Sequence, residues 1–188
     1  GDWEKENKAI RIKGEIKDED NNSIINGIVS PANDTINLQI DTNGARIEFL
    51  NNMISSIVSD VNSRVYGDIA VRGKLSDINL YGALAARGSM RLRTTNVIYN
   101  MSGDTIRLTH NRIGFDNIHI RDNDGNSGIV NGAVSHNSLK NFTCHFNIDA
   151  NNLLAYHSNS FGDDGFYGTA YITGNADFSS DDNGIRLR

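Results

Sequence analysis

The residues that could act as nucleophiles, bases or metal ligands are few and widely separated in this sequence. The five histidines are His110, His119, His136, His145 and His157. None of them stands at a metal-ligand spacing from a cysteine or from another histidine. No Gly-x-Ser-x-Gly motif marks an exposed nucleophilic serine, and no glycine-rich loop opens a helix to hold a phosphate. We therefore expect no catalytic residue, no metal and no cofactor, and the chain is not expected to be an enzyme.

One acidic segment, Asp122–Gly128, imitates the start of a calcium-binding loop. Asp122, Asp124 and Asn126 place oxygen ligands at alternate positions. An EF-hand loop would need Gly at its sixth position and Glu at its twelfth, where this chain has Ser127 and Ala133. The Asp-Gly dipeptide is also typical of a hairpin turn. The sequence favours a turn here over a cation site.

Composition and charge exclude several classes of function. The chain has 188 residues and a net charge of -5, and it lacks the basic, aromatic-rich patch of a nucleic-acid-binding protein. Its single cysteine, Cys144, alternates with Phe142 and Phe146 and is predicted to be a small buried hydrophobic residue. No stretch has the composition of a signal peptide or of a membrane-spanning helix. The charged start and strand-like end lead us to expect a segment of a longer protein.

A nine-residue pattern occurs three times along the chain. The three copies are VYGDIAVRG (Val65–Gly73), LYGALAARG (Leu80–Gly88) and FYGTAYITG (Phe166–Gly174). In a β-strand, alternate side chains point to opposite faces, so the glycines of each copy share a face with its aliphatic residues. Glycine weakens a strand and usually marks a bend or a close approach of another backbone. The tyrosines of the motif, Tyr66, Tyr81 and Tyr167, fall on the opposite face.

Most of the remaining chain shows the same alternation of apolar and polar residues. The clearest predicted strand contains Ile10, Ile12, Gly14 and Ile16. Residues 24–40 and 129–148 form a second, looser repeat: a strand with a central Gly, a polar turn and a returning strand. About a dozen or more short strands joined by tight turns are expected.

Turn-forming residues and one change of period divide these strands. Turns are predicted at Asn43-Gly44 and at Ser102-Gly103-Asp104. Between Leu50 and Val61 the apolar residues change to a helical spacing, which predicts one short amphipathic helix. Its polar face lacks Lys and Arg, which favours packing against the protein over lying on a membrane.

A dozen strands with one apolar face can bury that face in a closed barrel, a sandwich of two sheets, or a single sheet curved into a trough. The repeated hairpins and the many glycines on the apolar side favour the trough. The sequence therefore predicts an all-β fold, an elongated and strongly curved antiparallel sheet with a U-shaped apolar groove. One segment spans residues 1–188, with loose sub-repeats at 1–63 and 64–188. The curvature is assigned to Gly14, Gly27, Gly67, Gly73, Gly82, Gly88, Gly132, Gly168 and Gly174.

The order of these patterns resembles the C-terminal region of the TamB family, the translocation and assembly module proteins of the AsmA-like superfamily, in the form found in Bacteroidetes-type bacteria. The matching text is RVYGDIAVRGKLSDINLYGAL, TTNVIYNMSGDTI, RIGFDNIHIRDNDGNSGIVNGAVSHNSLKNF and FYGTAYITGNADFS. The earlier segment FLNNMISSIVSDVNSR fits the preceding repeat of such a protein. Each pattern is degenerate alone, and their succession carries the resemblance.

The resemblance implies a periplasmic part of a protein that is anchored in the inner membrane by an N-terminal helix. It implies a groove called a β-taco, a link to phospholipid transport toward the outer membrane, and a role in assembling outer-membrane proteins with a BamA-like partner, TamA. It supplies no catalytic residue, and no nucleic acid is expected as a partner.

Three functions remain open on this basis: a groove for phospholipid acyl chains, a chaperone-like groove for nascent β-barrel strands, and a structural β-solenoid or adhesin segment. A hydrolase is disfavoured because no nucleophile, base and oxyanion donor occur together. The predicted groove-lining residues are Val65, Ile69, Val71, Leu75, Leu84, Met90, Leu92, Phe115, Phe146, Phe166, Ile172 and Phe178.

Overall fold

A computed structural model describes residues 2–4, 8–18, 21–46, 58–93, 95–158, 167–181 and 184–187. The strands are β1 (Asp2–Glu4), β2 (Ala9–Asp18), β3 (Asn21–Ser30), β4 (Thr35–Arg46), β5 (Val58–Lys74), β6 (Asp77–Leu92), β7 (Val97–Thr109), β8 (Arg112–Arg121), β9 (Ser127–Asn137), β10 (Lys140–Ser158), β11 (Gly168–Asp181) and β12 (Gly184–Leu187). A 3-10 turn, η1 (Pro31–Asn33), joins β3 to β4. Within the described ranges there is no α-helix.

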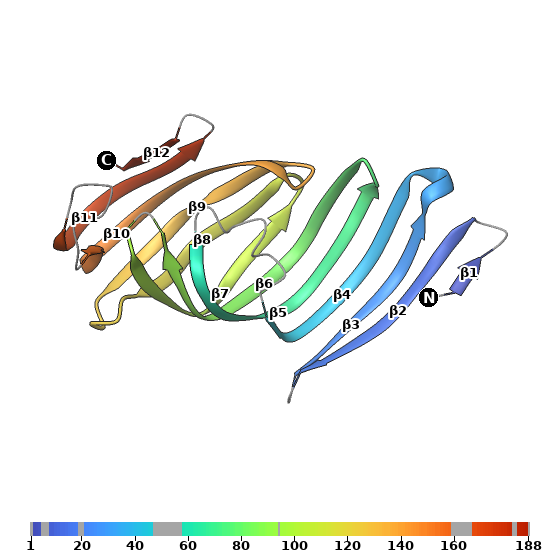
Figure 1. The fold of residues 1–188 in the computed structure, drawn as a ribbon, viewed down its shortest axis with the longest axis horizontal. Helices are drawn as coiled ribbons and strands as arrows, with labels where there is room; N and C mark the ends of the chain where they lie inside the picture. The colour runs from blue at the N-terminus through green and yellow to red at the C-terminus, as the bar shows by residue number, and fades with distance from the viewer. Residues whose placement is uncertain are drawn as a thin grey trace.

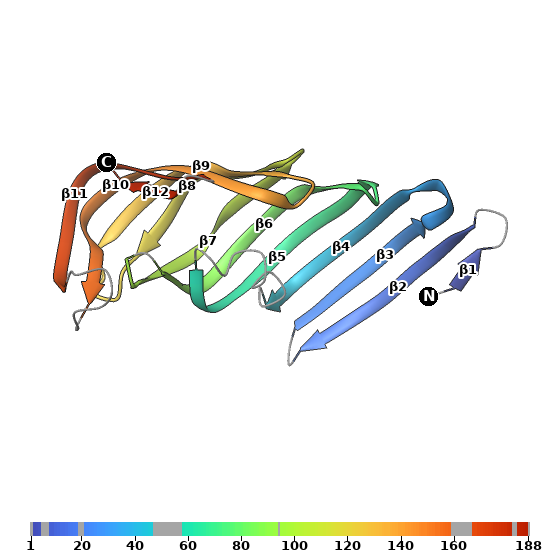
Figure 2. The same ribbon diagram turned by 45° about the horizontal axis from the view of Figure 1, so that its top comes forward.

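The twelve strands form one sheet in which chain order and spatial order are the same (Figure 1). Every pairing between neighbouring strands is antiparallel. The end strands β1 and β12 each pair with a single neighbour, so the sheet is open and not closed into a barrel. The prediction of an all-β, antiparallel fold is confirmed, and the strands bend along their length (Figure 2).

Several strands are far longer than predicted. β5, β6 and β10 contain 17, 16 and 19 residues, against about 5–6 in an average strand. The expected turn at Ser102-Gly103-Asp104 is wrong: these residues lie inside β7, where the register shifts against β6 between Ala85 and Arg87. Asn43-Gly44 is likewise a bulge inside β4, and Gly44 has a φ of 86°. Positive-φ residues suit bulges as well as turns, so the sequence alone did not separate the two.

The predicted helix at Leu50–Val61 is wrong at its end, because Val58–Val61 form the start of β5. Val58 pairs with Leu92 and Ser59 with Arg91, and a register shift follows before Asn62. Such a bulge moves apolar residues out of strict alternation and so imitates helical spacing. Residues 50–57 lie outside the described ranges. The boundary predicted between the sub-repeats, at residues 63 and 64, falls inside β5.

Buried apolar residues concentrate in the C-terminal two thirds of the sheet. One cluster consists of Ile118, Ile120, Ala150 and Leu153, and a second of Val65 and Ala86. The start of β7 also contacts β10, which is not its neighbour in the sheet. The hydroxyl of Tyr99 donates to the Leu154 carbonyl at 2.7 Å, and the amide of His157 donates to the Thr95 carbonyl at 3.0 Å. The sheet therefore curls on itself in this region.

Candidate functional site

One face of the sheet, which we call the apolar face, carries the alternating apolar residues of neighbouring strands in register. One cross-strand row runs Gly14, Ile25, Ile40, Ile69, Gly82, Leu108, Ile113, Val134 and Cys144. The next row runs Ser23, Thr42, Gly67, Leu84, Ile106, Phe115, Gly132, Phe146 and Phe178. No residue in these two rows is charged. With strands ~4.8 Å apart, ten strands span on the order of 45 Å.

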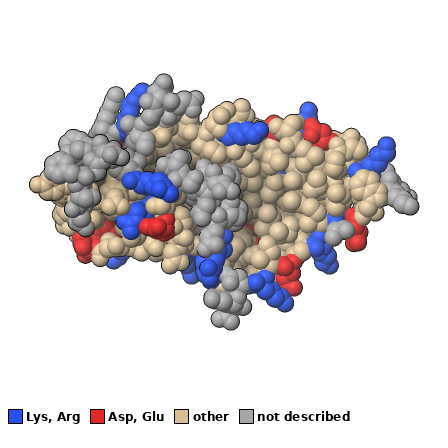
Figure 3. Space-filling view, viewed as in Figure 1, with Lys and Arg blue, Asp and Glu red and all other residues tan. Residues whose placement is uncertain are grey.

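Over β2–β5, charged side chains lie around this face and not on it (Figure 3). Figure 3 shows a broad area over β2–β5 without Lys, Arg, Asp or Glu, and the charged residues gather along its margins. Strand alternation explains the separation, because Arg11, Lys13 and Glu15 occupy the positions between Ile10, Ile12, Gly14 and Ile16.

Ten of the predicted groove-lining residues occupy the apolar face through strand alternation and register. They are Val65, Ile69, Val71, Leu84, Met90, Leu92, Phe115, Phe146, Ile172 and Phe178. Leu75 does not, because β5 ends at Lys74 and Leu75 lies in the tight turn before β6, where its amide donates to the Asp34 carbonyl at 3.2 Å. Phe166 lies outside the described residues.

The two halves of the apolar face differ in how well they are covered. In the C-terminal half the rings of Phe115 and Phe146 meet edge to face at 5.2 Å, and Phe178 is buried. In the N-terminal half Ile10 is 37% exposed and Ile16 is 57% exposed. Of the aromatic residues that sequence reasoning selected, Phe115, Phe146 and Phe178 thus serve largely as core.

The sequence-based list of candidates missed the accessible aliphatic residues of β2–β4. These are Ile10, Ile12, Ile16, Ile25, Ile36, Leu38 and Ile40. The signal was present in the alternation of the first predicted strand, which was used to define a strand and not a binding surface. An accessible apolar surface of this kind is the usual mark of an interaction site.

Glycines fill positions where neighbouring backbones approach closely. At Gly27 (φ +154°) and Gly132 (φ +150°) an added Cβ would overlap the carbonyl oxygens of Asn37 and His145 in the next strand. These two residues are the central glycines of the looser sequence repeat, and they lie opposite Leu38 and Phe146. Positive φ also occurs at the other glycines assigned to curvature except Gly14, namely Gly67, Gly73, Gly82, Gly88, Gly168 and Gly174.

The opposite face, which we call the outer face, carries two tyrosines of the repeated motif, Tyr66 and Tyr81, as predicted, whereas Tyr167 lies just before β11. The guanidinium of Arg87 lies 5.3 Å from the centre of the Tyr66 ring, an arrangement that stabilises the cation over the ring. Tyr81 pairs with the Nδ1 atom of His110 at 3.3 Å. Tyr167 is 63% exposed.

The acidic segment after β8 is a turn built around a buried carboxylate. Oδ1 of Asp122 accepts hydrogen bonds from the amides of Asp124 (3.0 Å) and Asn126 (2.9 Å), and Oδ2 accepts from the Asn126 side chain (3.0 Å) and the Leu154 amide (2.8 Å). Burial raises the pKa of Asp122, but these hydrogen bonds outweigh it, and the pKa falls below 3.8. Both oxygens are occupied by protein donors, which agrees with the turn and not with a cation site.

The Asp122 carboxylate also influences the contact between β7 and β10, in which the Tyr99 hydroxyl donates to the Leu154 carbonyl. Burial and the nearby negative charge of Asp122 raise the pKa of Tyr99 to about 12. The Tyr99 phenol therefore stays protonated and remains a hydrogen-bond donor to Leu154. Asp122 and Tyr99 together hold the curled part of the sheet.

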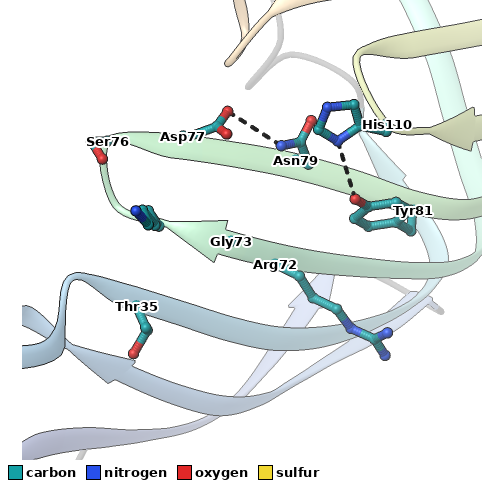
Figure 4. Close-up of a pocket in the computed structure, with 9 residues that line it drawn as sticks. Thr35, Arg72, Gly73, Ser76, Asp77, Asn79, Tyr81 and His110 are labelled. Carbon is teal, nitrogen blue, oxygen red and sulfur yellow. Dashed lines mark hydrogen bonds between the residues drawn. The ribbon is translucent and has the colours of Figure 1, made fainter.

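A shallow hollow on the outer face lies at the end of the β5–β6 hairpin (Figure 4). Its lining includes Arg72, Asp77, Asn79, Tyr81 and His110. The Arg72 side chain points away from the Tyr81–His110 pair (Figure 4). Asp77 accepts hydrogen bonds from Asn79 and from Ser138, so its carboxylate is engaged in structure. The hydroxyl of Ser76, also in the lining, donates to Oδ2 of Asp34 at 3.1 Å and so links the β5–β6 turn to the end of η1.

The described residues contain no group of three or more His, Cys, Asp or Glu side chains that could hold a metal. Burial raises the pKa of the Cys144 thiol, which disfavours the reactive thiolate. In the same part of the chain, no helix is both long and apolar enough to cross a membrane.

Comparisons of this chain with protein-family models, with curated proteins and with solved structures find no match in any of the three. The resemblance to the TamB family thus stays a prediction from the sequence patterns.

Proposed function

We propose that the apolar face binds the acyl chains of phospholipids and lets them move along the sheet. The observation that carries this proposal is the pair of uncharged cross-strand rows, one of which continues from β2 to β10 and the other from β3 to β11. Apolar contact is non-directional, so a continuous apolar surface holds a hydrocarbon chain without fixing one position. Each buried CH₂ contributes about 0.8 kcal/mol, so several methylene groups in contact are enough for useful affinity.

The wider setting belongs to the same proposal and rests on the sequence resemblance. The chain would be a periplasmic segment of an inner-membrane-anchored, TamB-like protein that shields phospholipids on their way to the outer membrane. A BamA-like partner such as TamA would receive it at that membrane, where it would support the assembly of outer-membrane proteins.

The test compares matched substitutions on the two faces of the sheet. Ile10 on the apolar face and Ile28 on the outer face are both 37% exposed and lie in adjacent, paired strands. We expect Ile10→Asp to reduce co-purifying phospholipid, measured by mass spectrometry, at least fivefold, and Ile28→Asp to leave it unchanged. Ile16→Asp and Ile24→Asp provide a second such pair, at 57% and 40% exposure.

These exposed positions are better test sites than the buried residues of the apolar face. Ile69, for example, is 8% exposed and packs between Gly82 and Ile40, so Asp there would also unfold the sheet. Absence of phospholipid from the unmodified protein, or equal loss from both faces, would contradict the proposal. Crosslinking of the face to barrel precursors in place of lipid would support the chaperone alternative.

A further inference from the structure

A chain of hydrogen bonds adjoins the hollow at the end of the β5–β6 hairpin, which we call the outer hollow. The side-chain oxygen of Asn111 accepts from the Ser138 amide at 3.3 Å. The NH₂ group of Asn111 is therefore the group that faces Nε2 of His110, at 3.2 Å, and it donates to that nitrogen. A neutral imidazole carries its proton on one nitrogen and accepts on the other, so the proton of His110 lies on Nδ1.

The direction of these hydrogen bonds continues to Tyr81. Nδ1 of His110 lies 3.3 Å from the Tyr81 hydroxyl, and because Nδ1 carries the proton, the Tyr81 oxygen is the acceptor. The proton of that hydroxyl is then not used by His110. Both residues line the outer hollow, so Tyr81 has a proton to donate into it.

Asn79 supplies a second donor whose direction is fixed. The residue is 3% exposed, and its side-chain oxygen accepts from the Asn111 amide at 3.2 Å. Its NH₂ group has two protons, and among the described residues it donates only to Asp77, at 3.4 Å. One buried N–H of Asn79 thus has no acceptor among these residues. Such a group needs an explanation in a folded protein, and a ligand or a water is the usual one.

Two cations complete the set of donors. Arg72 lies directly opposite Asn79 across β5 and β6, and Lys74 lies opposite Asp77. Neither cation forms an ion pair with a described residue. Asp77 is the one carboxylate of the lining, and it already accepts from Asn79 and Ser138. The lining therefore combines two positive charges with one negative charge, and it offers more donors than acceptors.

These donors lie close enough to reach one ligand. Arg72 and Tyr81 are diagonal neighbours on paired strands, a relation that separates such residues by about 7–8 Å, within reach of long side chains. Arg72 points away from Tyr81 in the structure (Figure 4), but it is exposed, and exposed side chains change rotamer within nanoseconds. The outer hollow has a volume of about 750 Å³, which is ample for one small group.

We propose that the outer hollow binds a phosphate group. Arg72 and Lys74 supply the positive charge, and arginine in addition matches phosphate with two parallel hydrogen bonds. Tyr81 and Asn79 fix the position of the remaining oxygens. Phosphate suits this set because it is an anion with several acceptor oxygens, whereas a carboxylate has two. A soluble phosphate ester and a lipid headgroup both carry this group, and the experiment below separates them.

The site is independent of acyl-chain binding, because its residues lie on the outer face. Ile10→Asp, which tests the apolar face, should leave the binding of inorganic phosphate unchanged. Loss of phosphate binding in the variants below would in turn leave the test of the apolar face as it stands. The two proposals can therefore fail separately.

The test titrates the intact chain with inorganic phosphate at constant ionic strength and follows NMR chemical shifts. We expect saturable shifts at Arg72, Tyr81 and the His110 side chain, and acetate should bind about tenfold more weakly, since a hydrogen bond to a charged group contributes about 1.5–3 kcal/mol. Arg72→Gln should weaken phosphate binding about tenfold. Arg107→Gln is the matched control, because Arg107 is also an exposed arginine of the outer face but does not line the outer hollow. Equal weakening in the two variants would reduce the effect to general charge attraction and overturn the site.

A second pair of variants tests the directed donor. Tyr81→Phe removes the hydroxyl proton and should weaken phosphate binding about tenfold. Tyr66→Phe, at the equivalent position of the first motif copy and outside the lining, should leave it unchanged. Nitrogen NMR of the unmodified chain reads the His110 tautomer directly. A proton on Nε2 of His110, or equal binding by the two tyrosine variants, would overturn the donor assignment.

Two further probes identify the source of the phosphate group. Glycerol phosphate represents a soluble ester, and vesicles of phosphatidylglycerol represent a lipid headgroup. Binding of glycerol phosphate without binding to vesicles would assign a soluble ligand. Vesicle binding that is lost in Arg72→Gln and kept in Arg107→Gln would assign a headgroup. The absence of saturable binding with inorganic phosphate, glycerol phosphate and vesicles would overturn the proposal.

Discussion

At the scale of single residues, some of the glycines are the positions with the least freedom to vary. Gly27 combines a positive φ with direct contact to the backbone of β4, and both features exclude a side chain. Gly14, one strand earlier, has an ordinary backbone and nothing within 4 Å of an added Cβ. The same residue type thus has a structural role at one position and none at the other.

The first prediction contrasts these two glycines. Gly27→Ala should destabilise the fold by about 1–3 kcal/mol from the strained backbone, with about 1–3 kcal/mol more from overpacking against Asn37 and Leu38. Gly14→Ala should be neutral or stabilising by up to about 1 kcal/mol, because alanine reduces the entropy of the unfolded chain. Urea unfolding followed by circular dichroism measures both. Equal midpoints for the two variants would contradict the close-approach argument.

At the scale of elements, the sequence predicted strand positions and the apolar face better than strand ends. Alternation correctly placed Ile10–Ile16 in β2, because one side of each strand is apolar along its length. It failed where a strand contains a bulge, as at Asn43-Gly44 and near Val58–Val61. A bulge and a turn use the same positive-φ residues, and only pairing with the neighbouring strand decides between them. The burial of individual side chains was not predicted either, because alternation does not reveal that the sheet curls and covers Phe115 and Phe146.

One element-level feature that the sequence did not reveal is a clamp between three hairpin turns at one end of the strands. The amide of Asn111 donates to Asn79 at 3.2 Å, and the side chain of Asn111 accepts from the Ser138 amide at 3.3 Å. His136 is buried, and its Nδ1 accepts from the Leu139 amide at 3.2 Å. Ser138 and Leu139 both have positive φ, so the clamp stabilises a strained turn.

The second prediction concerns the pH dependence of this clamp. Burial, and to a lesser extent the nearby His110, lower the pKa of the His136 side chain below 6.5. Protonation would place an N–H group at Nδ1, which would then face the N–H of Leu139 and could no longer accept its hydrogen bond. The folded protein therefore binds this proton less readily than the unfolded chain. Its stabilising contribution is complete above about pH 6.5 and is lost as pH falls through the lower folded pKa.

Thermal unfolding between pH 7.5 and 5 measures this effect. We expect the melting temperature of the unmodified chain to fall over that range. The fall should be smaller in His136→Ala, which should be less stable than the unmodified chain at pH 7.5. His145→Gln, an exposed histidine on the outer face, should keep the full dependence. An unchanged slope in His136→Ala would assign the effect to other groups.

At the scale of the whole molecule, a sheet in which each strand pairs only with its sequence neighbours behaves almost as a one-dimensional array. The stability of each part of the sheet then depends on how well its own strands are packed. The described residues of β2 and β3 bury only Ala9, Ser23 and Ser30, whereas β8 and β10 supply the Ile118–Leu153 cluster. The contacts that reach beyond nearest neighbours, such as that of β7 with β10 and the clamp of Asn111 with Ser138, lie in the better packed part. The accessible end of the apolar face is thus also the end with the weakest packing, which suits a surface that must adapt to what it binds.

The last prediction tests this gradient by native-state hydrogen exchange. Amides of β2 and β3 should exchange faster than those of β8 and β10, because opening them exposes less buried apolar surface. Tyr99→Phe removes the hydrogen bond to Leu154, worth about 0.5–1.5 kcal/mol, and should speed exchange in residues 153–158 about 2- to 13-fold. Exchange in β2 and β3 should not change, because only a chain of intervening strand pairs links them to Tyr99. Uniform exchange rates in all strands, or an equal acceleration in β2, would instead mean that the sheet unfolds as one cooperative unit. Binding at the N-terminal end of the sheet would then be coupled to the hydrogen bond between Tyr99 and Leu154.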